Sequence, residues 1–135
     1  MVKTKKVNYI YATGRRKSAS ARIRLFRGKG ENLANGVPME KYFPGLINKD
    51  VWSKPFKILG VSDKYYATAR VEGGGKNGQL EAIAHGIAKA LSLVSKDFRS
   101  PLKKSGLLTR DARIRQRRMV GTGGKARREK QSPKR

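Results

Sequence analysis

The sequence predicts an α/β (α+β) fold, a small mixed sheet packed on helices, with a long extended basic C-terminal tail. Alternating apolar side chains predict strands at residues 19–27 and 65–72, since successive strand side chains point to opposite faces. Apolar residues at helical spacing from Leu80 to Val94 predict one long helix. After Leu108, sizeable apolar residues are almost absent, which predicts a tail without a core of its own.

Two strands open the predicted domain. Residues 7–12 are rich in β-formers, and residues 19–27 alternate apolar side chains with arginines, which is the period of a half-buried strand. The two segments predict a hairpin or neighbouring strands, with residues 14–17 as the loop between them. A short third strand is expected around residues 31–37, interrupted by Gly36 and a proline.

Residues 38–60 have an irregular helical pattern. Pro38 suits a first helical position, where a missing N–H is harmless. Asn48 is predicted to cap a second helical piece, because its side chain can accept a hydrogen bond from a free backbone N–H. Pro55 lacks a backbone donor, so a break or kink is expected near Lys54.

A glycine-rich segment follows the strand at residues 65–72 and leads into the longest predicted helix, with Asn77 as its cap. A shorter helix is predicted at residues 98–104, and the leucines at residues 107–108 are expected to lean back on the core. Beyond Thr109 we expect an extended chain. Fully stretched, at roughly 3.3 Å per residue, the tail would reach about 100 Å.

Positive charge dominates the two ends of the chain. The sequence has 33 Lys and Arg against 9 Asp and Glu, a net charge of +24. Residues 1–29 contain ten basic residues and no acid, residues 30–105 twelve and seven, and residues 106–135 eleven and two. Such a field attracts phosphate and releases counterions on binding. Nucleic acid is therefore the first expected partner, and an anionic membrane surface is the second.

The basic tail needs a partner in order to be fixed in one conformation. Fixing thirty residues costs on the order of 30–60 kcal/mol of backbone entropy. The few apolar side chains of the tail cannot offset this cost, and its cations repel one another. We expect the tail to be disordered alone or to be held by a polyanion.

Composition excludes several classes of protein. The chain has no cysteine and one histidine, so disulfides and cysteine or histidine metal clusters are not expected. No stretch approaches the ~18 apolar residues of a membrane span. Residues 12–27 are Arg- and Ser-rich like a transit peptide, but their strand period argues against targeting. The predicted organisation is a basic N-terminal extension (1–6), a globular RNA-binding domain (7–105) and an extended basic C-terminal tail (106–135).

No catalytic site, metal site or cofactor is predicted. Gly73, Gly75 and Gly78 match the spacing of a dinucleotide-binding loop, but no second strand follows the helix. Two interpretations of the loop remain open: a tight strand-to-helix turn, or a site for polynucleotide phosphate in which Lys76 assists. His85 lies beside the apolar helix face with no Asp or Cys arranged around it, which favours a boundary position over a catalytic role.

The basic clusters favour nucleic-acid binding over a merely solvated surface. They are dense, lack matching acids and are rich in arginine, whose guanidinium pairs bidentately with phosphate oxygens. Arg22 and Arg24 share a strand face and lie close to Arg15, Arg16 and Lys17 in the predicted hairpin, so one contiguous patch is expected. Because aromatic residues are few, we expect contacts with the backbone of folded RNA or duplex rather than base stacking.

Several segments together resemble one family. They are Thr13-Gly14-Arg15-Arg16-Lys17 with Ala21-Arg22, Gly73-Gly74-Gly75 with Gly78-Gln79, Ala82-Ile83-x-His85-Gly86-Ile87-Ala88-x-Ala90-Leu91, Leu108-Thr109-Arg110-Asp111-x-Arg113, Lys125-Ala126-Arg127-Arg128 and the terminal Lys134-Arg135. In this order, and over nearly the whole chain, they resemble the bacterial-type small-subunit ribosomal protein S9 family.

The resemblance implies a fold like the second domain of ribosomal protein S5, seated in the head of the small subunit of a cytoplasmic ribosome. It implies small-subunit rRNA and neighbouring head proteins as partners, with no membrane and no small-molecule substrate. It also implies a tail end that contacts the anticodon stem-loop of the P-site tRNA through Lys134 and Arg135.

The residues expected to bind rRNA are Arg15, Arg16, Lys17, Arg22, Arg24, Lys76, Arg110, Arg113, Arg115, Arg117, Arg118, Lys125, Arg127 and Arg128. They combine the basic clusters with the matching family segments. The alternative function is a free nucleic-acid chaperone or histone-like architectural protein, which requires the charge but not a defined tail end.

Overall fold

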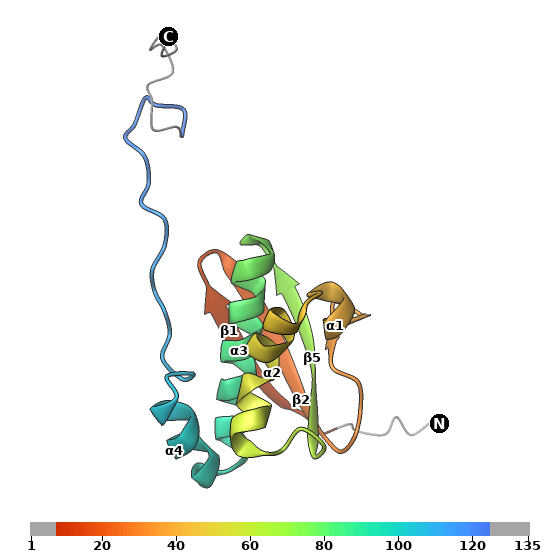
Figure 1. The fold of residues 1–135 in the computed structure, drawn as a ribbon. Helices are drawn as coiled ribbons and strands as arrows, with labels where there is room; N and C mark the ends of the chain where they lie inside the picture. The colour runs from red at the N-terminus through yellow and green to blue at the C-terminus, as the bar shows by residue number, and fades with distance from the viewer. Residues whose placement is uncertain (1–7, 125–135) are drawn as a thin grey trace, which may run out of the picture.

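The computed structural model describes residues 8–124, which form a five-stranded sheet, helices packed on it and an extended C-terminal segment (Figure 1). The strands are β1 (Ile10–Arg16), β2 (Ala19–Arg27), β3 (Leu33–Ala34), β4 (Val37–Pro38) and β5 (Tyr65–Glu72). The helices are α1 (Met39–Tyr42), α2 (Leu46–Leu59), α3 (Gly75–Val94) and α4 (Lys96–Lys104).

The sheet is mixed, with its strands in the order β1-β2-β5-β3-β4. β2 pairs antiparallel with β1 and β5, β3 runs parallel to β5, and β4 pairs antiparallel with β3. The α/β (α+β) class and the hairpin of the first two strands are thereby confirmed. The predicted third strand is instead two short strands, because Asn35 and Gly36 both have positive φ and turn the chain back on itself.

The predicted loop at residues 14–17 is wrong in extent, because β1 continues through Arg16 and the turn follows it. Gly14 is a packing residue and not a turn residue. A Cβ atom on Gly14 would overlap the carbonyl oxygen of Ala82 and the backbone of Gly86 in α3. The strand and the helix therefore approach one another where both lack bulky side chains.

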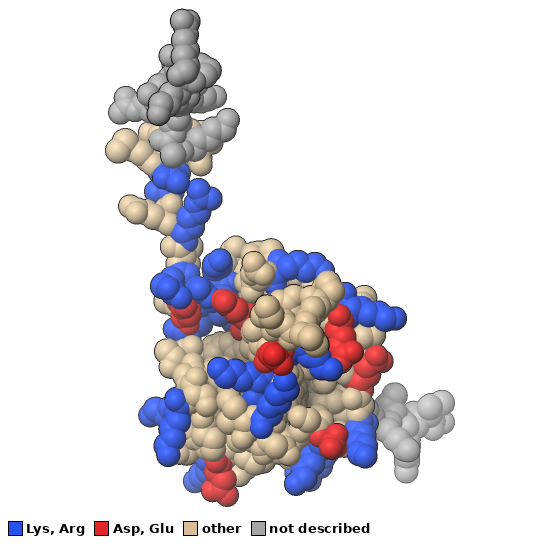
Figure 2. All heavy atoms as spheres, in the orientation of Figure 1, with Lys and Arg blue, Asp and Glu red and all other residues tan. Residues whose placement is uncertain are grey.

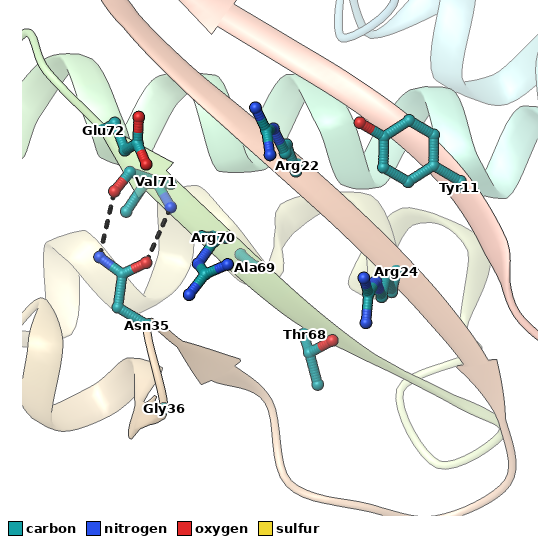
Figure 3. A pocket seen from close by; sticks show the side chains of 10 residues that line it. All are labelled: Tyr11, Arg22, Arg24, Asn35, Gly36, Thr68, Ala69, Arg70, Val71 and Glu72. Carbon is teal, nitrogen blue, oxygen red and sulfur yellow. Dashed lines mark hydrogen bonds between the residues drawn. The ribbon is translucent and has the colours of Figure 1, made fainter.

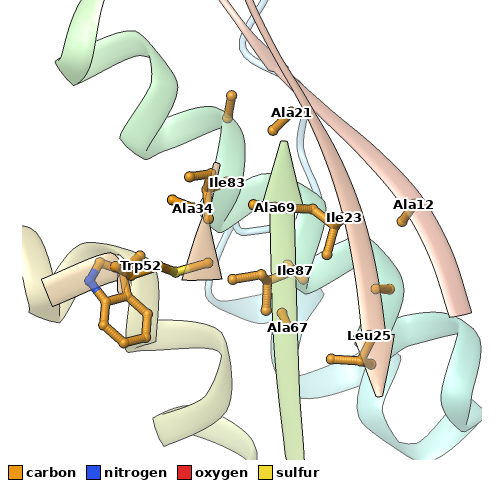
Figure 4. Close-up of a cluster of buried hydrophobic side chains, with 14 of the residues drawn as sticks. Ala12, Ala21, Ile23, Leu25, Ala34, Trp52, Ala67, Ala69, Ile83 and Ile87 are labelled. Atoms are coloured by element: carbon orange, nitrogen blue, oxygen red, sulfur yellow. The ribbon is translucent and has the colours of Figure 1, made fainter. Parts of the chain in front are cut away.

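The core lies between the sheet and α3 (Figure 4). On the inner face of the sheet, Ala21 and Ile23 are fully buried, as are Ile83 and Ile87 of α3. α2 packs beside α3 and adds Trp52 to the same core. Because α2 and α3 cover one face of the sheet, the side chains that alternate with the buried ones point to the other face.

The starts of the two long helices differ from prediction. α2 begins after Gly45, and Asn48 lies inside the helix, where its amide donates to a carbonyl four residues earlier at 2.7 Å. α3 begins after Gly74, whose φ of 67° is left-handed, so Asn77 lies in the first turn instead of capping it. Pro55 does not interrupt α2, because its ring is buried in the core and this packing offsets one missing backbone bond.

α4 begins at Lys96, two residues before its predicted start. Ser95 explains the difference, because its hydroxyl accepts a hydrogen bond from the backbone N–H of Asp97 at 3.2 Å and caps the helix. Leu102 is fully buried, and the leucines at residues 107–108 pack against the core as expected.

The described part of the tail, residues 109–124, contains no helix or strand; it runs along the side of the domain and then extends beyond it (Figure 1). This confirms the expected extended tail for these residues, while residues 125–135 lie outside the described part of the chain. Within residues 8–124, no helix is both long and apolar enough to cross a membrane.

Candidate nucleic-acid interface

The face of the sheet that α2 and α3 leave uncovered carries basic side chains from neighbouring strands. Arg22 and Arg24 of β2 and Arg70 of β5 are exposed on this outer face. They line a hollow of about 650 Å³ (Figure 3). The other lining residues are Tyr11, Asn35, Gly36, Thr68, Ala69, Val71 and Glu72. We call this surface the sheet-face hollow.

Two of the arginines in the sheet-face hollow stand directly opposite one another. Arg22 and Arg70 are paired residues in the antiparallel ladder of β2 and β5. Like charges in directly opposed positions destabilise a sheet. Among residues 8–124, neither these two side chains nor Arg24 forms an ion pair with an acid, although Glu72 lies at the edge of the hollow. The arrangement suits an anion that binds between them.

Asn35 forms one wall of the sheet-face hollow. Its side-chain amide donates to the carbonyl of Val71 at 3.1 Å and accepts from the backbone N–H of Val71 at 2.9 Å (Figure 3). These bonds continue the ladder beside β5, so the backbone of Val71 is satisfied within the protein. The guanidinium groups are thus the main donors left for a ligand.

An aromatic row occupies the outer face beyond Arg24. The rings of Tyr9 and Phe26 lie 5.7 Å apart, and those of Phe26 and Tyr66 lie 5.2 Å apart and nearly parallel. The Arg24 guanidinium lies 5.1 Å from the centre of the Tyr9 ring. Only the rings of Phe26 and Tyr66 are stacked, whereas the Tyr9 ring is tilted by 54° to Phe26, contacts Arg24 and stays 46% exposed.

The structure brings some of the predicted rRNA-binding residues together and separates others. Arg22 and Arg24 lie in the sheet-face hollow, and Arg15 is exposed at the end of the neighbouring strand. Lys17 is exposed in the turn that follows, with a left-handed φ of 54°. These four residues form the part of the expected patch that is available to a partner.

Arg16 is separated from that patch because its side chain points toward α3. Its Nε donates to Glu81 at 2.5 Å, its Nη2 lies 3.3 Å from Asp111, and its side chain is only 12% exposed. The guanidinium also donates to the backbone carbonyl of Arg113 at 3.1 Å. Its contact with rRNA stays a prediction, which this geometry does not favour.

Asp111 ties the start of the tail to the domain. Arg113 binds both carboxylate oxygens of Asp111 through three hydrogen bonds of 2.8 to 3.1 Å. These bonds hold the pKa of Asp111 far below its usual range, and the charge of Arg16 acts in the same direction. The acid is therefore ionised at any physiological pH, and the pKa of Arg113 is raised in return.

The glycine loop before α3 has a structural explanation. A Cβ atom on Gly74 would lie 2.5 Å from the backbone nitrogen of Ala19, so the turn must pass close to the start of β2. Lys76 donates to the backbone carbonyl of Tyr42 at 2.9 Å, and its ammonium group lies 3.9 Å from the centre of the Tyr42 ring. These contacts support a tight strand-to-helix turn, and a phosphate contact by Lys76 stays a prediction.

The tail carries most of the remaining predicted residues, and Figure 2 shows basic side chains along its described part. Arg110, Arg115, Arg117 and Arg118 are exposed there. Lys125, Arg127, Arg128, Lys134 and Arg135 lie outside the described residues.

Sequence reasoning missed Arg70. Its signal was present, since Arg70 alternates with the buried Ala69 and Val71 in the best-predicted strand and therefore had to face outward. What the sequence does not state is the register that sets Arg70 opposite Arg22. Lys89 and Arg99 were also missed, and they line a second, smaller cavity with Arg110.

An α/β domain with an uncovered cationic sheet face and a basic, extended tail is the architecture of a nucleic-acid-binding protein. The chain belongs to the ribosomal protein S9 family: the family model described as "Ribosomal protein S9/S16" matches residues 14–135. It is 43% identical to the small ribosomal subunit protein uS9 of Maridesulfovibrio salexigens, over 87% of this chain and 90% of that protein. It is 47% identical to the uS9 protein of Lawsonia intracellularis, over 82% and 85% of the two chains.

Family membership confirms two expectations that the resemblance implied, and one that was drawn from the residues. The chain is a protein of the small ribosomal subunit, the relatives are bacterial, and the family is structural and not enzymatic. It agrees with rRNA as the general partner.

Proposed function

We propose that the sheet-face hollow binds the backbone of small-subunit rRNA in the head of the subunit, and that the tail end contacts the P-site tRNA. The first part depends on one observation: Arg22 and Arg70 stand directly opposite one another and form no ion pair within residues 8–124. A phosphate between them would pair with both guanidinium groups and remove their mutual repulsion. Because the donors of the hollow are guanidinium groups directed at phosphate, the contact reads RNA shape and not base identity.

The proposed tRNA contact is supported by the way the tail leaves the domain. Arg16 and Asp111 fix its starting point beside α3, and the described tail beyond Arg113 makes no hydrogen bond or ion pair with the domain. Arg115, Arg117 and Arg118 are exposed along it. The tail is therefore free to follow a polyanion outward, with Lys134 and Arg135 as the expected tRNA contacts.

The hollow is tested by RNA affinity at several salt concentrations. The double variant Arg22→Gln/Arg70→Gln should bind an rRNA fragment from the subunit head more weakly. The plot of its log affinity against log salt should be less steep, by about 0.7–0.9 for each phosphate that the variant no longer neutralises. Lys57→Gln is the control, since Lys57 is paired with Asp50 on α2. A slope equal to that of the control would refute the hollow as the rRNA site. Equal affinity for duplex DNA would favour the free chaperone.

The tail contact is tested separately with a chain that lacks Lys134 and Arg135. We expect this chain to enter the small subunit normally, because the sheet-face hollow is intact. P-site tRNA should dissociate faster from these subunits, as measured by filter binding. If the shortened chain fails to assemble, or if tRNA dissociation is unchanged, the proposed division between domain and tail is wrong.

A further inference from the structure

The start of α2 exposes two consecutive large apolar side chains. Leu46 is 82% exposed and Ile47 is 80% exposed, although the same helix buries Trp52 and Phe56 further along. Both side chains therefore point away from the core. Covering such a pair with a partner removes apolar area from water, which favours association. The pair marks a candidate interaction surface.

A pocket of about 290 Å³ adjoins the exposed pair. Pro44 and Asn48 flank the pair in the chain and line the pocket, and the Asn48 amide donates to the Pro44 carbonyl at 2.7 Å. The other lining residues come from the end of α1 and the start of α3, and they are Tyr42, Phe43, Lys76, Asn77 and Leu80. We call this pocket together with Leu46 and Ile47 the α2-start surface.

The walls of the pocket suit an apolar side chain. The rings of Tyr42 and Phe43 meet edge to face, with 4.7 Å between their centres. Phe43 and Leu80 belong to the core, so the pocket is lined by residues that packing holds in place. The Tyr42 hydroxyl donates to the side chain of Gln79 at 2.8 Å, which fixes that ring as well. In protein interfaces, a side chain that fills such a preformed pocket contributes much of the affinity.

The one charged residue that lines the pocket, among residues 8–124, is a lysine. The Lys76 ammonium group lies 3.9 Å from the centre of the Tyr42 ring and donates to a neutral backbone carbonyl. Neither contact neutralises its charge, and within the described residues Lys76 forms no ion pair. Because an ammonium group has three donors, it can bind a carboxylate without losing the carbonyl. The pocket therefore combines apolar walls with a place for one negative charge.

Three possible occupants fit the α2-start surface poorly. An RNA backbone offers phosphate and sugar oxygens but no apolar side chain, so it would leave Leu46 and Ile47 in water. A lipid surface has no protruding group that would fill the pocket. A second copy of this chain carries 33 basic residues against 9 acids, so two copies repel one another. A different and acidic protein meets both requirements.

We propose that the α2-start surface docks a short acidic segment of another protein, which places an aromatic or aliphatic side chain in the pocket and a carboxylate beside Lys76. The net charge of +24 attracts such a partner from a distance, and the apolar contacts fix it at this surface. The α2-start surface and the sheet-face hollow share no lining residue. The docking site therefore does not depend on the proposed rRNA contact.

The docking site is tested by selecting binders of the full-length protein from a library of random displayed peptides, with excess RNA duplex present to cover the basic surfaces. Enriched peptides should carry an acid beside an aromatic or large aliphatic residue. Their affinity, measured by fluorescence anisotropy, should fall about tenfold or more in Leu46→Ser/Ile47→Ser and in Lys76→Gln. Leu93→Ser is the matched control and should bind like the native chain, since Leu93 is a 66% exposed apolar residue near the opposite end of α3.

Four results would overturn the docking site. The first is a selection without any acidic peptide that distinguishes the native chain from Leu46→Ser/Ile47→Ser. Weaker binding of an rRNA fragment by this double variant would favour RNA as the occupant. Weaker binding of the double variant to vesicles of phosphatidylcholine and phosphatidylglycerol would favour a lipid surface. A native dimer that the double variant does not form, detected by sedimentation equilibrium, would favour a second copy. Urea denaturation followed by fluorescence of the buried Trp52 verifies that each variant is folded.

Discussion

The Nη2 atom of Arg16 lies 3.3 Å from a carboxylate oxygen of Asp111 and joins the first strand to the start of the tail. The same guanidinium binds Glu81 of α3 and the backbone carbonyl of Arg113. Three segments that are far apart in the sequence thus meet at one side chain. Arg16 sets the position and direction in which the tail begins, while the rest of the described tail has no comparable attachment.

Replacing Asp111 with asparagine should loosen the start of the tail without unfolding the domain. The neutral amide cannot bind Arg16 and Arg113 as ion pairs, so the backbone at residues 109–113 gains freedom. Trypsin should cleave after Arg113 faster in this variant than in the native chain. Asp50→Asn, which removes a similar surface pair on α2, is the control and should leave that cleavage rate unchanged. Equal rates in all three chains would contradict the anchoring role.

The same anchor should resist acid. The folded-state pKa of Asp111 is far below its ordinary value of 3.8, so the stabilisation is present above 3.8 and is lost only as the pH falls through the lower folded value. Heteronuclear NOE values at residues 109–113 should therefore be the same at pH 4 as at pH 7. A decrease already at pH 4 would mean that the pairing is weaker in solution.

A methyl group at Gly86 should destabilise the domain. Its Cβ would lie 2.5 Å from Cγ1 of Ile23 and 3.1 Å from the backbone nitrogen of Gly14, so β1 and α3 would have to separate. We expect Gly86→Ala to lower the free energy of unfolding by about 1–3 kcal/mol. Gly78→Ala is the matched control in the same helix, because its Cβ would meet its neighbours at 3.4 Å or more. Urea denaturation should show the control to be neutral, or more stable by up to about 1 kcal/mol.

The opposed arginines should reduce the stability of the free protein. Replacing Arg22 or Arg70 singly with threonine should raise the free energy of unfolding by about 0.2–1 kcal/mol, because either change removes a directly opposed like-charge pair. The double variant should gain less than the sum of the two, since the repulsion can be removed only once. Additive gains in a double-mutant cycle would show that the two charges do not interact.

His85 should make stability depend on pH near neutrality. Its pKa in the folded state is lowered from 6.5, chiefly by burial, so the unfolded chain binds a proton more readily. The free energy of unfolding should therefore fall as the pH drops through 6.5 and level off below the folded pKa. Because the chain has no other histidine, His85→Gln should flatten the curve between pH 5 and 7. An unchanged slope would exclude His85 as its origin.

The elements predicted best are those whose burial pattern is local. Residues 19–27 and 65–72 form strands with the predicted bounds, since in each strand buried apolar residues alternate with more exposed ones. Gly14 was misassigned to a loop. A side chain at this position would overlap Ala82, and because Ala82 is distant in sequence, the local pattern does not indicate this packing role. Pro55 was expected to disturb its helix, and the tertiary packing of its ring outweighs that local effect.

The candidate site was predictable only where one strand supplies it. Arg22 and Arg24 share a face by strand periodicity alone. The sequence pattern did not show that Arg15 and Arg16 point to opposite faces of the sheet. That difference arises because β1 extends through both residues, whereas a loop was predicted there. Arg70 joins the hollow through the pairing register of β2 and β5, which depends on the assembled sheet.

The anchor of the tail also imposes an order on how the molecule is completed during synthesis. Arg16 emerges early, meets Glu81 65 residues later, and reaches Arg113 only 97 residues later. Domains generally fold as units from the N-terminal side during synthesis. The newly made chain therefore acquires its sheet and α3 first, and a nascent protein can be folded and able to bind RNA through Arg22 and Arg70 before its tail is attached.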